Sequence, residues 1–250
     1  MSVWWSAWRY GPLLLLAAAW EAVTQANLVS PYVLPPLSGV LVSSFHLMTD
    51  DLAYHTALSL MRGAIGLAAA VVVGVAAGVL MAWYGPVRRL LNPFFQLFYP
   101  LPKSALIPIA IVWLGLGTVS KIALIFVGVL LPIVVSTFNA VRGVDQLLVW
   151  SARSAGAREP AMLYEIVIPA AAAEILNGIR VALALTFILV VAGELIFAND
   201  GLGYLISFLG EGGDYKGMFA GVLVISLIGF AADRLFVLAT RRVMAWQEVS

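Results

Sequence analysis

Few side chains in this sequence could carry out chemistry, and those few lie far apart. There is no cysteine, so disulfide bonds, thiol nucleophiles and zinc–thiolate sites are excluded. The two histidines, His46 and His55, cannot build a metal centre alone, although carboxylates could in principle complete one. Ser104 and His55 lie on different segments, and neither has an evident catalytic partner. The sequence therefore predicts no enzyme active site.

ATP hydrolysis by a phosphate-binding loop is also excluded. Such a loop ends in Gly-Lys-Ser or Gly-Lys-Thr, because its backbone amides and its lysine hold the phosphates. The three lysines of the chain, Lys103, Lys121 and Lys216, follow Pro, Ser and Tyr instead. If ATP drives a process in which this chain takes part, another subunit must hydrolyse it.

The longest strongly polar stretch, residues 142–169, has the pattern of a helical hairpin. Residues 144–155 are expected to form one helix, and Gly156 offers a left-handed or flexible break after it. Pro160 suits the start of a second short helix, which Pro169 is expected to close. A hairpin with an apolar side and several charges suits docking on a cytoplasmic partner. The alternative is an amphipathic helix pair that lies on the membrane surface.

The composition indicates the surroundings of these residues. The 250 residues are 62% hydrophobic and 11% charged, whereas an ordinary soluble domain has about 25% charged residues. The net charge is +1, from 14 basic and 13 acidic side chains, so no basic field exists to hold nucleic acid. A soluble globule, a disordered tail and a nucleic-acid binder are largely ruled out, and the lipid bilayer is the expected solvent.

The fold class is predicted to be an all-α membrane protein with six transmembrane helices. Four segments are long and apolar enough to cross a bilayer, namely residues 57–83, 119–141, 175–197 and 218–238. A fifth, residues 90–116, contains four prolines, so its helix must be kinked or broken. Residues 10–26 are the weakest candidate. They are interpreted as an uncleaved first helix, although a cleaved signal peptide, which would leave five spans, is the alternative.

Basic residues between the predicted spans gather on one side of the membrane. Residues 27–54 contain no Lys or Arg. The basic residues of the other side are Arg9, Arg88, Arg89, Arg142, Arg153, Arg158, Arg241 and Arg242. The positive-inside rule makes that side cytoplasmic, so both termini are expected to be cytoplasmic.

Polar residues within the spans are candidates for a translocation path. Arg180 and Glu194 are 14 residues apart, so on one helix they point in similar directions, about 21 Å apart along its axis. Ionisable groups in a span usually face a cavity or a partner. The alternative places these two side chains in opposite interfaces, each simply solvated. Pro102 and Ser104, in the proline-rich span, complete the candidate path.

The polar stretch resembles the EAA loop of the permease subunits of bacterial ABC importers. That loop has the pattern Glu-Ala-Ala, three residues, Gly, nine residues, Ile, one residue, Leu-Pro. Here Gly156 is followed at the same spacing by Ile166, Ile168 and Pro169, and Ala152 matches the second alanine. Trp150 stands in place of the glutamate, and Ser151 in place of the first alanine.

Three further segments resemble the nitrate, sulfonate and taurine group of these permeases. They are LPPLS at 34–38, the proline-rich FFQLFYPLPKSALIPIAIVWLGLG at 94–117 and GELIFANDGLGYLI at 193–206. The resemblance implies a single permease domain over residues 1–250 with the type I ABC importer fold. It comprises a first helix at 10–26, a five-helix core at 57–240 and a cytoplasmic coupling loop at 142–169.

The resemblance also implies partners and roles. Such permeases work as a pair, expected here to be a homodimer, in the bacterial inner membrane. Their partners are two cytoplasmic ATPases that hold ATP and Mg and an external solute-binding protein. This chain would bind no cofactor itself, and its solute would be a small anion. The coupling helix would be residues 157–164. The residues expected to couple to the ATPase are Ala152, Arg153, Gly156, Ala157, Arg158, Glu159, Ile166, Ile168 and Pro169.

The alternative function from the sequence is a secondary transporter or channel of small solutes. Such a protein would also have broken helices and buried charges. The six predicted spans contain no inverted repeat that we can detect, which argues against it.

Overall fold

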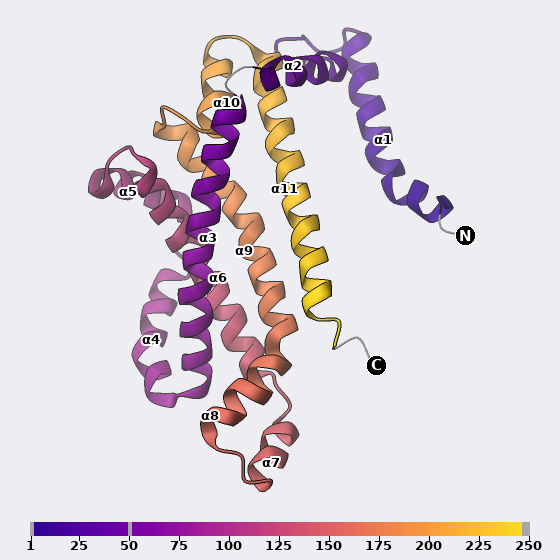
Figure 1. Ribbon diagram of the computed structural model, residues 1–250. Helices are drawn as coiled ribbons and strands as arrows, with labels where there is room; N and C mark the ends of the chain where they lie inside the picture. Colours follow the sequence, from indigo (N-terminus) through magenta and orange to yellow (C-terminus); the bar gives the residue numbers. More distant parts are fainter. Residues whose placement is uncertain (1–2, 50–51, 247–250) are drawn as a thin grey trace.

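The computed structural model describes residues 3–49 and 52–246, and every regular element among them is helical (Figure 1). The predicted all-α class is therefore confirmed for these residues, whereas the two chain termini, residues 1–2 and 247–250, lie outside them. The elements are α1 (Val3–Gln25), α2 (Leu37–Thr49), α3 (Leu52–Trp83), α4 (Gly85–Phe98), a 3₁₀ turn (Lys103–Ala105), α5 (Leu106–Leu114), α6 (Thr118–Arg142), α7 (Gln146–Ser154), α8 (Glu159–Ala161), a π-helical stretch (Met162–Val167), α9 (Ile168–Phe197), α10 (Leu202–Glu211) and α11 (Tyr215–Val243).

Four of the described helices are long and apolar enough to cross a membrane. They are Leu52–Trp83, Thr118–Arg142, Glu159–Ile196 and Tyr215–Val243. The proline-rich segment is broken, as the sequence predicts, because Gly85–Phe98 and Lys103–Leu114 meet at 85°. This bent pair would be a fifth span. Helix α1 is not among the four, so a sixth span stays a prediction.

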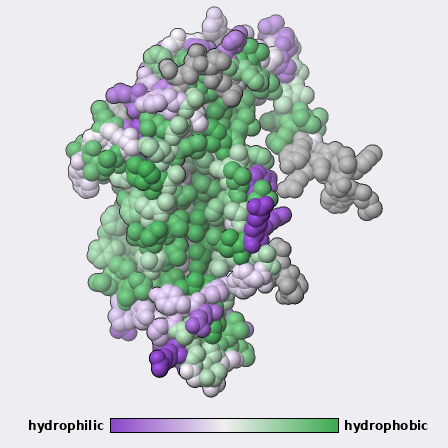
Figure 2. Space-filling view, viewed as in Figure 1, coloured by the Kyte–Doolittle hydropathy of each residue, from purple (hydrophilic) through white to green (hydrophobic). Residues whose placement is uncertain are grey.

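Helices α3, α6 and α9 form the centre of the molecule, with α11 beside α9 (Figure 1). Helix α2 lies across the upper end, α1 stands apart from the bundle, and the α7–α8 hairpin projects at the lower end. Figure 2 shows hydrophobic residues over the middle of the visible face, with hydrophilic residues mainly towards its ends and its lower right edge. This distribution suits a multi-pass membrane protein.

Close approach of α3 and α6 depends on glycines of α3. A Cβ atom added at Gly66 would lie 2.7 Å from Ile125 Cγ2, and one added at Gly78 would lie 2.6 Å from Thr137 Cβ. Small residues let helix backbones approach closely in lipid, where van der Waals packing contributes much of the association. These contacts bring polar residues near the ends of α3 next to α6 and α9.

One local prediction is wrong, namely that Pro169 closes the second helix of the hairpin. The helix that begins at Glu159 continues through Pro169 as one span to Ile196. Proline lacks an N–H group and disturbs an α-helix at the preceding turn. The turn before Pro169 is π-helical (Met162–Val167), and such local adjustments let a membrane helix accommodate proline.

Candidate functional site

The first arm of the hairpin is defined by caps at both ends of α7. At its start, Asp145 Oδ1 accepts a hydrogen bond from the Leu147 amide at 2.9 Å, an N-cap that satisfies a free helix donor. At its end, the Gly156 amide donates to Arg153 O and the Ala157 amide to Ala152 O, both at 3.0 Å. This pair of bonds is a Schellman motif, which needs a left-handed residue at the Gly156 position.

Gly156 has that conformation, with φ of +85°, and no heavy atom lies within 4 Å of where its Cβ would be. The left-handed break predicted from the sequence is therefore confirmed. The second arm starts at Glu159, with Pro160 in its first turn as predicted. Arg153 Nη2 donates to Glu159 Oε1 at 2.8 Å, so an ion pair joins the two arms across the turn.

The structure brings the predicted coupling residues together in this one hairpin. Arg153, Gly156, Arg158 and Glu159 are exposed at its tip. The half-buried members are Ala152, Ala157, Ile166, Ile168 and Pro169. The helix begins at Glu159, so Ala157 and Arg158 belong to the turn that precedes it. The hairpin thus offers an exposed charged tip that continues directly into the spanning helix α9.

The candidate path residues, in contrast, are separated. Pro102 and Ser104 are exposed at the 3₁₀ turn between α4 and α5. Arg180 and Glu194 lie at different levels of α9 and contact different neighbours. The Arg180 guanidinium donates to both carboxylate oxygens of Asp233 on α11, at 2.8 Å for Nη2 to Oδ2. Arg180 therefore has an ion-pair partner rather than being simply solvated.

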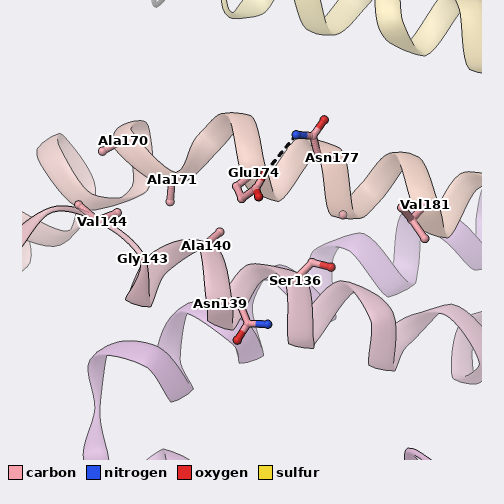
Figure 3. A pocket seen from close by; sticks show the side chains of 11 residues that line it. Ser136, Asn139, Ala140, Gly143, Val144, Ala170, Ala171, Glu174, Asn177 and Val181 are labelled. Carbon is pink, nitrogen blue, oxygen red and sulfur yellow. Dashed lines mark hydrogen bonds between the residues drawn. The ribbon is translucent and has the colours of Figure 1, made fainter.

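A cavity of about 610 Å³ lies between α6 and α9 towards the hairpin, and none of the four predicted path residues lines it (Figure 3). Its polar lining comes from Ser136 and Asn139 of α6 and from Glu174 and Asn177 of α9. Asn177 donates to Glu174 Oε2 at 3.1 Å. The sequence signal that could have found this wall is the spacing of polar residues at 174 and 177, which share one helix face.

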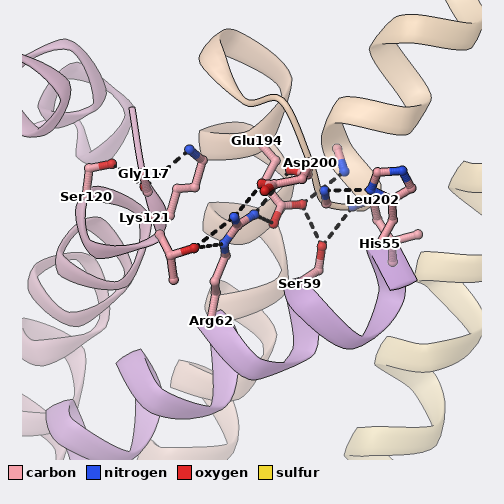
Figure 4. Close-up of polar contacts among 12 residues, drawn as sticks. His55, Ser59, Arg62, Gly117, Ser120, Lys121, Glu194, Asp200 and Leu202 are labelled. Atoms are coloured by element: carbon pink, nitrogen blue, oxygen red, sulfur yellow. Dashed lines mark hydrogen bonds and ion pairs between the residues drawn. The ribbon is translucent and has the colours of Figure 1, made fainter. Parts of the chain in front are cut away.

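Glu194 faces a partner inside the bundle, which is one of the placements that the sequence suggested, and it is 1% exposed rather than solvated at an interface. Its Oε1 accepts a hydrogen bond from Arg62 Nη1 of α3 at 2.8 Å (Figure 4). Its Oε2 accepts from Ser59 Oγ at 2.7 Å and from the Gly203 amide at 3.1 Å. The carboxylate thus has a cation and two further donors inside the bundle.

Arg62, also 1% exposed, contacts two more parts of the chain. Its guanidinium donates to Thr118 Oγ1 at the start of α6 and to both the carboxylate and the main-chain oxygen of Asp200. The Asp200 side chain is 35% exposed. The adjoining loop is held from α3, because the Gly201 amide donates to His55 Nδ1 at 3.0 Å and the Leu202 amide to Ser59 Oγ at 2.8 Å.

Lys121 is the last member of a network of polar side chains around Arg62. We define this network as Arg62, Glu194, Asp200, Lys121, Ser59, His55 and Thr118. The Lys121 ammonium donates to the carbonyls of Leu116 and Gly117, and Figure 4 shows it beside Arg62 and Glu194. Two cations and two carboxylates balance in the network, which buried charges require. Because its charged groups are mostly buried and their donors are hydrogen-bonded, the network holds α3, α6, α9 and the loop before α10 together. It is not an open binding site.

The sequence reasoning missed Arg62, although a signal existed. Arg62 is the single charged residue of the apolar run 57–83, and a lone charge within a span indicates a partner. The partner itself, 132 residues away, could not be found from helix periodicity.

A family model described as "Binding-protein-dependent transport system inner membrane component" matches residues 70–245. This chain belongs to that family. It is therefore a permease, a membrane-embedded transport component, and the resemblance of the hairpin to the EAA loop agrees with this.

Several relatives of this permease are similar along most of its length. The chain is 34% identical to the taurine transport system permease protein TauC of Escherichia coli (strain K12), with 94% of this chain and 88% of that protein covered. It is 30% identical to the putative aliphatic sulfonates transport permease protein SsuC of Bacillus subtilis (strain 168), with 96% and 88% covered. It is 29% identical to the formylaminopyrimidine transport permease protein ThiX of Halalkalibacterium halodurans, with 86% of each covered.

The permease fold is also found among solved structures. A chain of the MetNI methionine ABC transporter, in an inward-facing conformation, matches with a TM-score of 0.63 and 21% sequence identity. The match covers 75% of this chain and 95% of that chain. This permease therefore shares the fold of that ABC transporter chain.

Replacement of Arg180 with alanine in the permease is expected to lower the melting temperature only slightly. The Arg180–Asp233 pair is 46% and 32% exposed, and exposed ion pairs contribute little to stability. Thermal unfolding of the detergent-solubilised protein measures the effect. The exchanged variant Arg180→Asp/Asp233→Arg is expected to recover the loss. A large loss that the exchange does not recover would mean that Arg180 has another role.

Proposed function

We propose that this permease pairs with a second copy to form the path by which a small anionic solute crosses the bacterial inner membrane. An external binding protein delivers the solute, and two cytoplasmic ATPase subunits, which hold ATP and Mg, drive the cycle. The permease itself binds no cofactor and catalyses no bond chemistry. The observation that carries the proposal is the hairpin, which presents an exposed, charged, rigidly capped tip at one end of a spanning helix.

In this proposal the hairpin couples the ATPases to the membrane helices. The tip residues Arg153, Arg158 and Glu159 contact a groove of the ATPase, and Gly156 sets the angle between the two arms. Closure of the ATPases on ATP draws the two hairpins of the dimer together and switches the bundle between inward- and outward-facing states, a rigid-body change. Trp150, which is 60% exposed, supplies an aromatic contact where relatives of the EAA pattern carry glutamate.

The proposal includes six spans with both termini cytoplasmic. Helix α1 supplies the first span, and the bent α4–α5 pair supplies the third. Two observations support this orientation. Helix α1 runs upwards to the end where α2 lies, and α11 runs downwards towards the hairpin end (Figure 1). Basic residues occur at the start of α4 and in the last turns of α6 and α11, and the positive-inside rule makes the side on which these helix ends lie cytoplasmic.

The solute class is proposed from relatives whose names specify taurine and aliphatic sulfonates. Both carry a sulfonate group, which is the anionic part that they share, although the ammonium group of taurine balances its sulfonate charge. The path is proposed to include the cavity between α6 and α9, with Pro102, Ser104 and Arg180 as further candidates. Glu194 acts on this path through the buried network and not by contact with the solute.

Transport in reconstituted proteoliposomes tests this function. The permease, co-expressed with the ATPase and binding-protein genes of its own operon, is expected to co-purify with the ATPase. It is expected to accumulate radiolabelled taurine or a short alkanesulfonate only when ATP and the binding protein are present. An ATPase variant without its phosphate-binding lysine is the matched control. Solute accumulation driven by an ion gradient without any ATPase would favour a secondary transporter and contradict the proposal.

A further inference from the structure

A second cavity, of about 360 Å³, lies between the hairpin and the ends of α3 and α6. Its polar lining is separate from that of the cavity between α6 and α9. The coupling proposal uses Trp150, Arg153 and Glu159 from its rim but assigns the space itself no role. The side chains that matter for its chemistry are Trp83, Arg142, Gln146, Trp150, Arg153 and Glu159. The cavity is thus an open one, bordered by two spanning helices on one side and by both arms of the hairpin on the other.

The charges around this cavity leave one cation uncompensated. Arg153 and Glu159 form an ion pair at 2.8 Å and neutralise each other. Arg142, at the last turn of α6, forms no ion pair within the part of the chain that the structure describes. Its guanidinium lies 5.9 Å from the centre of the Phe138 ring. The Arg142 side chain is exposed, so the lining carries an accessible net charge of about +1 that attracts an anion.

The remaining lining has the character of a membrane interface. Trp83 ends α3 and Trp150 lies on α7, so two indole rings flank the cavity. Tryptophan is enriched at the level of the lipid headgroups. Valines 141, 149 and 167 add apolar surface beside the charged groups. A ligand that suits both kinds of lining has an anionic head next to apolar or glycerol-like atoms.

We propose that this cavity binds the phosphodiester headgroup of an anionic phospholipid such as phosphatidylglycerol. The planar fork of Arg142 matches two phosphate oxygens, and Gln146 supplies an additional amide donor. Basic pockets between membrane helices on the cytoplasmic side bind anionic headgroups. Inorganic phosphate shares the anion chemistry, but it makes no use of the two indole rings and the valines. A bound headgroup would fix the hairpin against α3 and α6, because the hairpin and the ends of these two helices all line the cavity.

Lipid titration of the full-length chain, purified in detergent, tests the proposal. Native mass spectrometry counts the phosphatidylglycerol molecules bound per chain as the lipid concentration rises. Arg142→Gln is expected to weaken binding at one site by about tenfold, since a hydrogen-bonded charge is removed. Arg142→Lys, which keeps the charge but loses the fork, is expected to weaken it less. Arg241→Gln, which removes a basic residue on α11 outside the cavity, is the matched control and is expected to bind as the unaltered chain does.

Three outcomes would overturn the proposal. If Arg142→Gln and the unaltered chain bound phosphatidylglycerol equally, the cavity would not be the lipid-binding site. If zwitterionic phosphatidylcholine bound at this site as tightly as phosphatidylglycerol does, the negative charge of the lipid would have no role in binding. Displacement of the lipid by inorganic phosphate at equal concentration would identify the ligand as a free anion. Circular dichroism and thermal unfolding confirm that each variant is folded, and the assay requires neither transport nor ATPase, so it stands apart from the proposed function.

Discussion

Replacement of Arg62 with methionine is expected to destabilise the permease by about 3–5 kcal/mol. Methionine fills much of the volume of the arginine side chain, so the loss reports the charge rather than a cavity. The variant leaves Glu194, which is 1% exposed, with its two neutral donors and without the guanidinium. It also frees Asp200, whose side chain is 35% exposed and is readily solvated. The cost therefore arises almost entirely from the buried Glu194 carboxylate.

A double-mutant cycle isolates this contribution. Arg62→Met/Glu194→Gln removes both charges of the pair and is expected to recover most of the stability that Arg62→Met loses, because a neutral amide can keep the bonds to Ser59 and Gly203. Glu194→Gln alone is expected to cost less than Arg62→Met, since Asp200 still compensates Arg62. The free energy of unfolding is measured by denaturant titration in detergent micelles for the unaltered protein, the two single variants and the double variant. Additive effects of the two substitutions would contradict a coupled buried pair.

Replacement of Gly156 with valine is expected to reduce ATP-driven uptake to background while the protein remains inserted in the membrane. Gly156 has φ of +85°, a conformation that costs a residue with a Cβ about 1–2 kcal/mol and a β-branched residue more. The Schellman bonds from Gly156 and Ala157 would be lost, and with them the angle between the hairpin arms. Deletion of residues 157–164 is expected to have the same effect by removing the second arm.

Two glycine controls separate conformation from general damage. Gly156→Asn is expected to keep most of the uptake, because asparagine adopts the left-handed conformation more readily than other residues with a Cβ. Gly85→Val alters a glycine at the start of α4 that has no atom within 4 Å of its Cβ position and no positive φ, so uptake is expected to be unchanged. Undiminished uptake by the 157–164 deletion would contradict the assignment of the hairpin as the coupling element.

The sequence predicted the local features of the fold well, because local chemistry decides them. Gly156 and Pro160 carry conformational preferences that fix a turn and a helix start wherever they stand. The break in the proline-rich segment follows in the same way from missing N–H groups. Pro169 shows the limit of this reasoning, since a π-helical turn of neighbouring residues accommodates it and the helix does not end.

The buried network could not be assembled from the sequence, because it depends on which helices are neighbours. Glu194 was singled out as a charge in apolar surroundings and Arg62 was missed, and the pattern contains nothing to pair two residues on helices α3 and α9. The same holds for Arg180, whose partner Asp233 lies on another span. The cavity between α6 and α9 arises from the way in which these two helices pack. The sequence shows which residues share a face of each helix, but it does not show that the two faces lie against each other.

The uninterrupted helix from Glu159 to Ile196 joins the two regions on which these experiments act. Glu159 stands at the hairpin tip, and Glu194, in the network, lies about 52 Å away along the same axis. A rod of that length behaves as a lever. A tilt of about 5° around its centre moves each end by roughly 2 Å in opposite directions. That distance is enough to break the hydrogen bonds of the network. In the proposed orientation, a push at the hairpin end would therefore reach the opposite end of the helix without any signal passing from residue to residue.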